Sequence, residues 1–161
     1  NALGRQACEN AAYDFDVGPV GVGFGATSGS RPGGIGTASL EGPGGVMVAA
    51  LIVVNSFGEV FEGTPSVKIP LPKAPIAGLN TTIGLVATNA ALDKGPLKRI
   101  AMMAQDGLAR TIRPIHTLFD GDTIFSMATG EVDIATDPLN ISLLGALAAD
   151  CVAKAVQRAV L

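Results

Sequence analysis

The residues best suited to chemistry in this sequence lie around position 81, in the segment Leu79-Asn80-Thr81-Thr82-Ile83-Gly84. A proline-rich stretch ends at Asn80, and two hydroxyl residues then open an apolar run. A threonine hydroxyl is a poor nucleophile at neutral pH because it stays protonated. If the Asn80–Thr81 peptide bond breaks, the freed α-amine of Thr81, with an ordinary pKa of about 7.7–8.0, can accept that proton. The pattern indicates a self-cleaving hydrolase, and the alternative is a pair of ordinary strand threonines.

Two carboxylates follow about forty residues later, on either side of a glycine. Asp120 and Asp122 flank Gly121, and a tight turn there can aim both side chains at one point. Two acids so close raise each other's pKa unless a cation or hydrogen-bond donors lie between them. A free ammonium group on Thr81 would be such a cation. The alternatives are a solvated Asp-Gly turn and a calcium loop, but the EF-hand pattern needs further ligands.

Asn55 and His116 are the other polar residues of interest. Asn55 ends the longest apolar run, and a buried amide there must find hydrogen-bond partners. It could donate to an oxyanion, or it could simply form a turn at the strand end. His116 is the only histidine, which favours a structural hydrogen-bonding role and gives poor support to a His-based zinc site. No Gly-x-Ser-x-Gly motif indicates a serine triad.

The composition predicts one domain with a core of small residues. The 161 residues are 48% hydrophobic but only 4% aromatic, with no Trp, so Ala, Val, Ile, Leu and Gly must fill the core. The net charge of -3 and the lack of a basic stripe give nucleic-acid binding no electrostatic support. The apolar run 46–54 is too short to span a bilayer. Cys8 and Cys151 are expected to be two buried free thiols.

Hydrophobic periodicity and turn residues predict alternating strands and helices. Short connections favour antiparallel pairing over βαβ winding, and the pattern fits an α+β fold, a four-layer αββα sandwich with mainly antiparallel sheets. Asn140 is predicted to cap the last helix. The predicted helices are 2–12, 97–112 and 141–160, and the predicted strands are 20–27, 35–40, 46–55, 59–61, 82–88 and 123–129.

A proline-rich linker, 63–80, divides the chain into two parts. Its four prolines prevent a helix and central sheet pairing. Residues 1–80 are predicted to form the C-terminal part of a large subunit that includes this linker. Residues 81–161 are predicted to form a small subunit that begins at the nucleophile, the two together making one domain. Because the sequence starts at Asn1 within a helix-like pattern, we expect an N-terminal portion to be missing.

Several segments together resemble the L-aminopeptidase/D-esterase family of N-terminal-nucleophile hydrolases. That family includes β-peptidyl aminopeptidases and nylon-oligomer hydrolases. The likeness covers nearly the whole chain, and its motifs are specific in combination although each is weak alone. The segments that carry it are Gly33–Ser39, Val53–Asn55, Asn80–Leu92, Ala104–Thr117, Phe119–Thr123 and Ala128–Gly130.

The resemblance implies a fold, a reaction and a set of roles. It implies autocleavage between Asn80 and Thr81 and hydrolysis of amide bonds in small peptides or amides through an acyl-enzyme on Thr81. It places Asp120 and Asp122 beside the new terminus and gives Asn55 the oxyanion role. It implies homo-oligomers of two-subunit units, often tetramers. We also expect no cofactor and no metal. We also expect no membrane partner and a cytoplasmic location, since no export signal is visible.

The chain departs from the family pattern at one visible position. Many members carry a lysine before the Gly-Gly pair, where this chain has Arg31-Pro32. Arg31 could supply a positive charge, but it cannot act as a neutral base. Two alternatives stay open: acetyl transfer, as in the related ornithine acetyltransferase-like group, and a non-catalytic oligomerising fragment.

Overall fold

The protein is described by a computed structural model that covers residues 2–64 and 80–161. Most of the predicted linker, 65–79, lies outside these described residues. The α-helices are α1 (Ala2–Glu9), α2 (Lys94–Ala109) and α3 (Pro138–Val160), with short 3-10 helices η1 (Gly21–Gly23) and η2 (Pro43–Gly45). The strands are β1 (Thr27–Ser28), β2 (Arg31–Pro32), β3 (Gly34–Glu41), β4 (Met47–Val54), β5 (Glu59–Val60), β6 (Ile83–Ala90), β7 (Ile112–Arg113) and β8 (Thr123–Val132).

The main sheet has four strands in the order β3-β4-β6-β8. The β3–β4 and β4–β6 pairs are antiparallel, as predicted, but β6 and β8 are parallel. The prediction of antiparallel pairing is wrong for this last pair because α2 connects the two strands and returns the chain to the same end of the sheet. Strand pairs β1-β2 and β5-β7 form two small antiparallel sheets at the side.

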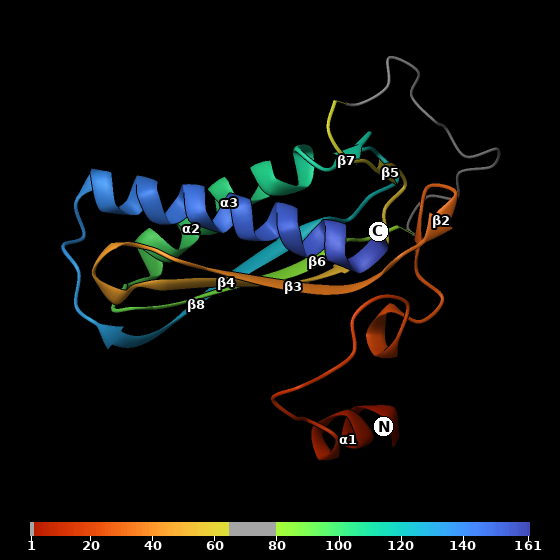
Figure 1. The fold of residues 1–161 in the computed structure, drawn as a ribbon, viewed down its shortest axis with the longest axis horizontal. Helices are drawn as coiled ribbons and strands as arrows, with labels where there is room; N and C mark the ends of the chain where they lie inside the picture. The colour runs from red at the N-terminus through yellow and green to blue at the C-terminus, as the bar shows by residue number, and fades with distance from the viewer. Residues whose placement is uncertain (1, 65–79) are drawn as a thin grey trace.

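The predicted α+β class is confirmed, and two of its four layers are visible in the described residues. Helices α2 and α3 lie together along one face of the sheet, while α1 lies on the other side (Figure 1). One helical layer therefore covers one face of one sheet. The second sheet and second helical layer of an αββα sandwich stay a prediction.

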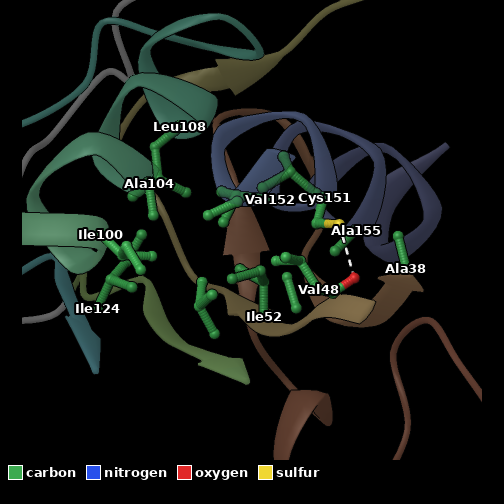
Figure 2. Packing of buried hydrophobic residues seen from close by; sticks show 14 of the residues in the cluster. Ala38, Val48, Ile52, Ile100, Ala104, Leu108, Ile124, Cys151, Val152 and Ala155 are labelled. Carbon is green, nitrogen blue, oxygen red and sulfur yellow. Dashed lines mark hydrogen bonds between the residues drawn. The ribbon is translucent and has the colours of Figure 1, made fainter. Parts of the chain in front are cut away.

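The core lies between the sheet and the helix pair. Burial alternates along β4, where Val48, Ile52 and Val54 are fully buried and point toward the helices. Figure 2 shows Val48 and Ile52 packed beneath Val152 of α3. Because side chains alternate along each strand, the register of β4 fixes which residues face the helices and which face the other side of the sheet.

The two cysteines differ in their surroundings. The Sγ of Cys151 donates a hydrogen bond to the backbone oxygen of Val48, at 3.2 Å, and burial raises the pKa of this thiol (Figure 2). Cys8 is exposed on α1, a helix with no buried residue. The prediction of two buried free thiols is therefore right for Cys151 and wrong for Cys8, because α1 does not pack into the core.

Small residues bring α3 close to its neighbours, as the composition indicated. A Cβ atom added at Gly36 of β3 would lie 2.1 Å from the backbone oxygen of Ala155 in α3. One added at Gly107 of α2 would lie 2.4 Å from the backbone oxygen of Ala149. Glycine at these two positions allows backbone-to-backbone contact across the helical and sheet layers.

Two local predictions are wrong. Residues 20–27 do not form a strand, because Gly21 and Gly25 have positive φ angles of 53° and 78° and η1 occupies the middle of the segment. The last helix begins at Pro138 and is capped by Asp137, whose carboxylate accepts from the backbone N–H groups of Leu139 and Asn140. Asn140, the predicted cap, lies within the first turn.

Helix α3 is long and apolar enough to cross a membrane by length and composition alone. Half of its most apolar window is buried inside the structure, where it packs on β3, β4 and α2. A core helix passes the same test, and the buried stripe accounts for the apolar character of α3.

Substitution of Gly36 by alanine should destabilise the fold. The new methyl group would collide with the α3 backbone, and overpacking of this kind costs about 1–3 kcal/mol of the free energy of unfolding. Gly95 has no atom within 4 Å of an added Cβ and lies in the first turn of α2, so Gly95→Ala is the matched control and should cost nothing. Urea unfolding of both variants measures the difference. Equal stabilities would contradict the close packing of α3 on β3.

Candidate active site

The ends of three neighbouring strands bring the predicted site residues together. Thr81 lies just before β6, which pairs with β4 on one side and β8 on the other. The β4–β6 pairing includes Val53 opposite Ile83, and continuing that register by two residues places Asn55 opposite Thr81. On the other side, a parallel bridge between Asn80 and Asp120 extends the β6–β8 pairing.

Thr81 and Asn55 line one pocket of about 640 Å³, together with Asn80. Thr81 and Asn55 are each partly buried, so both remain within reach of a bound molecule. The other lining residues are mainly apolar or small: Val22, Phe24, Gly25, Ala26, Thr27, Val53 and Ile83. The structure therefore joins a hydroxyl and an amide in one pocket with a largely apolar wall.

The peptide group at the predicted cleavage point is held by two hydrogen bonds. The hydroxyl of Thr81 donates to the backbone oxygen of Asn80, at 2.7 Å. The backbone N–H of Gly121 donates to the same oxygen, at 3.0 Å. The nucleophile predicted for self-cleavage thus lies beside the carbonyl group that it would attack.

The neighbouring threonine has a different environment. Thr82 is fully buried, and its Oγ1 has no hydrogen-bond partner among the described residues. Because side chains alternate along an extended strand, Thr82 and Thr81 point to opposite faces of the sheet. Of the two candidate hydroxyls, only Thr81 lines the pocket.

The carboxylate of Asp120 connects two loops. Its Oδ1 accepts from the backbone N–H of Phe57 at 2.9 Å, and its Oδ2 accepts from the backbone N–H and the hydroxyl of Thr117. The rings of Phe57 and Phe119 pack with their centroids 5.0 Å apart and support the same junction. Three donors to one carboxylate fix the backbone around it.

The carboxylate of Asp122 is almost completely buried, with 1% of its side chain exposed. Its Oδ1 accepts from the backbone N–H of Thr82 at 3.0 Å. Its Oδ2 lies 2.9 Å from Nδ1 of His116, whose backbone N–H also points to it at 3.3 Å. His116 makes the kind of hydrogen bond that the sequence predicted, and Asp122 holds the residue that follows Thr81.

The side chain of Asn55 is hydrogen-bonded to the first residue of β1. Its Oδ1 accepts from the backbone N–H of Thr27, at 3.1 Å, and both residues line the pocket. This contact fixes the plane of the amide at the pocket wall. The amide of Asn55 is therefore held at the wall of the pocket that Thr81 also lines.

Arg31 and the two aspartates lie outside the pocket lining. Nε of Arg31 is 3.5 Å from Oε1 of Glu59, so its charge is paired at the surface. Asp120 and Asp122 lie beside the backbone of the junction instead of facing the pocket. Within residues 2–64 and 80–161, no group of three or more His, Cys, Asp or Glu side chains could hold a metal ion.

Some functional contacts could not be identified from the sequence. The backbone N–H of Gly121 contacts the junction, and Phe57 and Thr117 anchor Asp120. Backbone donors leave no signal in residue type, and Phe57 and Thr117 contact Asp120 only through the tertiary fold. The only sequence signal for the Gly121 contact was the position of this glycine between two aspartates.

The fold of the described residues is similar to the N-terminal-nucleophile hydrolase fold. A solved structure of the L-aminopeptidase D-Ala-esterase/amidase from Ochrobactrum anthropi, described as a variant of that fold, superposes with a TM-score of 0.77 at 25% identity. It matches 96% of this chain and 47% of the other. The PH0078 protein from Pyrococcus horikoshii gives a TM-score of 0.73 at 30% identity over 96% of this chain and 47% of the other.

The chain belongs to peptidase family S58, which it matches over residues 2–161. It is 43% identical to an uncharacterised aminopeptidase of Mycobacterium leprae, over 99% of this chain and 55% of the relative. It is 30% identical to the 6-aminohexanoate-oligomer endohydrolase of Kocuria sp., over 98% of this chain and 55% of the relative. The chain thus spans about half the length of these relatives, and the predicted family resemblance is confirmed.

Replacement of Asp120 by asparagine should weaken the junction. An asparagine keeps only one acceptor oxygen, so at least one of the donors from Phe57 and Thr117 loses its partner, which costs about 1–3 kcal/mol. Asp93→Asn is the matched control, because this exposed helix cap makes no side-chain capping bond and asparagine caps equally well. Thermal unfolding of the two variants measures the cost. If both variants unfold like the parent, Asp120 does not anchor the two loops.

Proposed function

We propose that this chain is part of a self-cleaving N-terminal-threonine hydrolase that acts on amide bonds of small peptides or amides. The observation that carries the proposal is the contact between the Thr81 hydroxyl and the Asn80 carbonyl oxygen, at 2.7 Å, within a pocket shared with Asn55. Membership in peptidase family S58 supports the reaction class. The names of the relatives, an aminopeptidase and an oligomer endohydrolase, support amide hydrolysis.

The first stage would be cleavage of the chain itself. The Thr81 oxygen attacks the carbonyl carbon of Asn80, its proton passes to the nitrogen of Thr81, and the peptide C–N bond breaks. An ester joins the two parts until water hydrolyses it and leaves a carboxylate on Asn80. Thr81 then carries a free α-amine next to its hydroxyl, so the nucleophile and its base belong to one residue.

The second stage would be turnover of substrate. The Thr81 hydroxyl, deprotonated by its own α-amine, attacks the carbonyl carbon of the substrate amide. The C–N bond breaks, the amine leaves with the proton that the α-amine took up, and water hydrolyses the acyl-enzyme that remains. The oriented amide of Asn55 would stabilise the tetrahedral oxyanion, and a good donor of this kind contributes about 3–4 kcal/mol. Asp122 already binds the N–H of Thr82, so this carboxylate and Asp120 would orient the new ammonium group.

The pocket wall supports a preference for apolar substrate segments. Val22 and Phe24 are exposed at the pocket, and Val53 and Ile83 complete the apolar part of its lining. Such side chains bind uncharged hydrocarbon parts of a ligand by excluding water. We also propose that the enzyme is soluble and cytoplasmic. We further propose that it assembles as a homo-oligomer, a tetramer of two-subunit units.

Substitution of Thr81 by alanine should leave the full-length protein in one piece, because the attacking oxygen is gone. Thr81→Ser keeps the oxygen and should still cut. Thr82→Val is the matched control, since it removes the buried hydroxyl that has no partner and leaves Thr81 unchanged. Denaturing electrophoresis and intact-mass measurement separate cut from uncut chains.

Three results would contradict the assignment. One is a Thr81→Ala protein that still splits at the 80–81 junction. Another is a Thr82→Val protein that stays whole. The third is acetylglutamate formation from acetylornithine and glutamate, without amide hydrolysis, which would assign the cut enzyme to acetyl transfer.

A further inference from the structure

We infer that Gly121 has two roles in self-cleavage. Its backbone N–H is the oxyanion donor, and because glycine has no side chain, it leaves room for the Thr81 hydroxyl. This inference rests on the proposed function, and it assigns an oxyanion donor to the first stage, whereas Asn55 is proposed as the donor of the second stage. It concerns a backbone group, which no comparison of residue types between relatives would detect.

The donor contacts the oxygen on which charge would develop. The N–H of Gly121 lies 3.0 Å from the backbone oxygen of Asn80, and the attacking hydroxyl of Thr81 lies 2.7 Å from the same oxygen. Attack on the carbonyl carbon would place a negative charge on that oxygen. A donor already in place stabilises this charge without reorganisation, as in other oxyanion holes.

The carboxylates of the two neighbouring residues hold the N–H of Gly121 in its orientation toward the backbone oxygen of Asn80. Asp120 is bound by Phe57 and Thr117, and Asp122 is bound by His116 and the N–H of Thr82. The peptide group between them is therefore fixed from both ends. This gives the two aspartates a role in the uncut chain, before any ammonium group exists.

The three atoms nearest to a Cβ added at residue 121 all belong to Thr81. A Cβ atom added at Gly121 would lie 2.8 Å from Oγ1 of Thr81, and its next nearest atoms, at 3.7 and 3.8 Å, also belong to Thr81. The φ angle of Gly121 lies outside the left-handed region, so the backbone itself would accept alanine. Glycine is needed here because a side chain would displace the attacking oxygen.

The donor is tested by an amide-to-ester replacement in the full-length protein. Glycolic acid introduced at position 121 by nonsense suppression replaces the N–H with an oxygen and adds no bulk. Loss of one oxyanion donor slows reactions by roughly 10²–10³-fold, so self-cleavage should slow by that factor. The matched control is the α-hydroxy analogue of threonine at position 123, whose N–H donates to the oxygen of Thr82 at 2.9 Å in the same ladder.

The outcomes separate this inference from the function on which it rests. Slow cleavage with the ester at 121 and near-normal cleavage with the ester at 123 would support it. Equal cleavage rates for both esters would overturn the donor role while self-cleavage itself stands. An unsubstituted protein that never cuts would overturn the proposed function as well.

The space requirement has a test that does not depend on cleavage. Gly121→Ala should destabilise the protein when Thr81 is present, but it should cost little in a Thr81→Ala background, where the oxygen it would strike is absent. Unfolding of the two single variants and the double variant gives the coupling between the positions. Additive effects would overturn the claim that Thr81 is what excludes a side chain at 121.

Discussion

The structure of the site depends on the pairing of β6 with a strand on each side. The antiparallel pairing with β4 ends at Val53 and Ile83, just before Asn55 and Thr81, which line one pocket. The parallel bridge from Asn80 to Asp120 brings Gly121 to the other side. A slip of one residue in either pairing would turn the Thr81 hydroxyl to the opposite face of the sheet. Strand register therefore decides which of the two adjacent threonines lines the pocket.

The register is in turn held by the core and by the two aspartates. The helix-facing residues of β4 and β6 pack under α2 and α3, and glycines such as Gly36 let α3 approach the sheet backbone. At the strand ends, where backbone pairing stops, the carboxylates of Asp120 and Asp122 accept hydrogen bonds from backbone N–H groups instead. The same carboxylates thus hold the backbone around the Asn80–Thr81 bond. They would also lie beside the new N-terminus if that bond were cleaved.

The sequence predicted the strands of the main sheet and helices α2 and α3 well, because their apolar periodicity reflects burial. It failed at residues 20–27, where alternating glycines mimic a strand but Gly21 and Gly25 have positive φ angles. It also predicted β8 as antiparallel, since the direction of β8 depends on how α2 crosses the sheet.

Residue types indicated the candidate site, but its three-dimensional arrangement did not follow from them. Type and spacing singled out Thr81, Asn55 and the two aspartates, and only the family resemblance predicted roles for them. That Asn55 and Thr81 share a pocket while the carboxylates bind backbone N–H groups follows from strand alternation in the folded sheet. The donor at Gly121 belongs to the backbone, which residue types do not reveal.

The most direct measurement of the central claim is N-terminal sequencing of every fragment in the purified full-length protein. If the Thr81 hydroxyl attacks the carbonyl that it contacts, one fragment must begin Thr-Thr-Ile-Gly. A protein that stays uncut after prolonged incubation, or a fragment that begins at any other residue, would contradict the account.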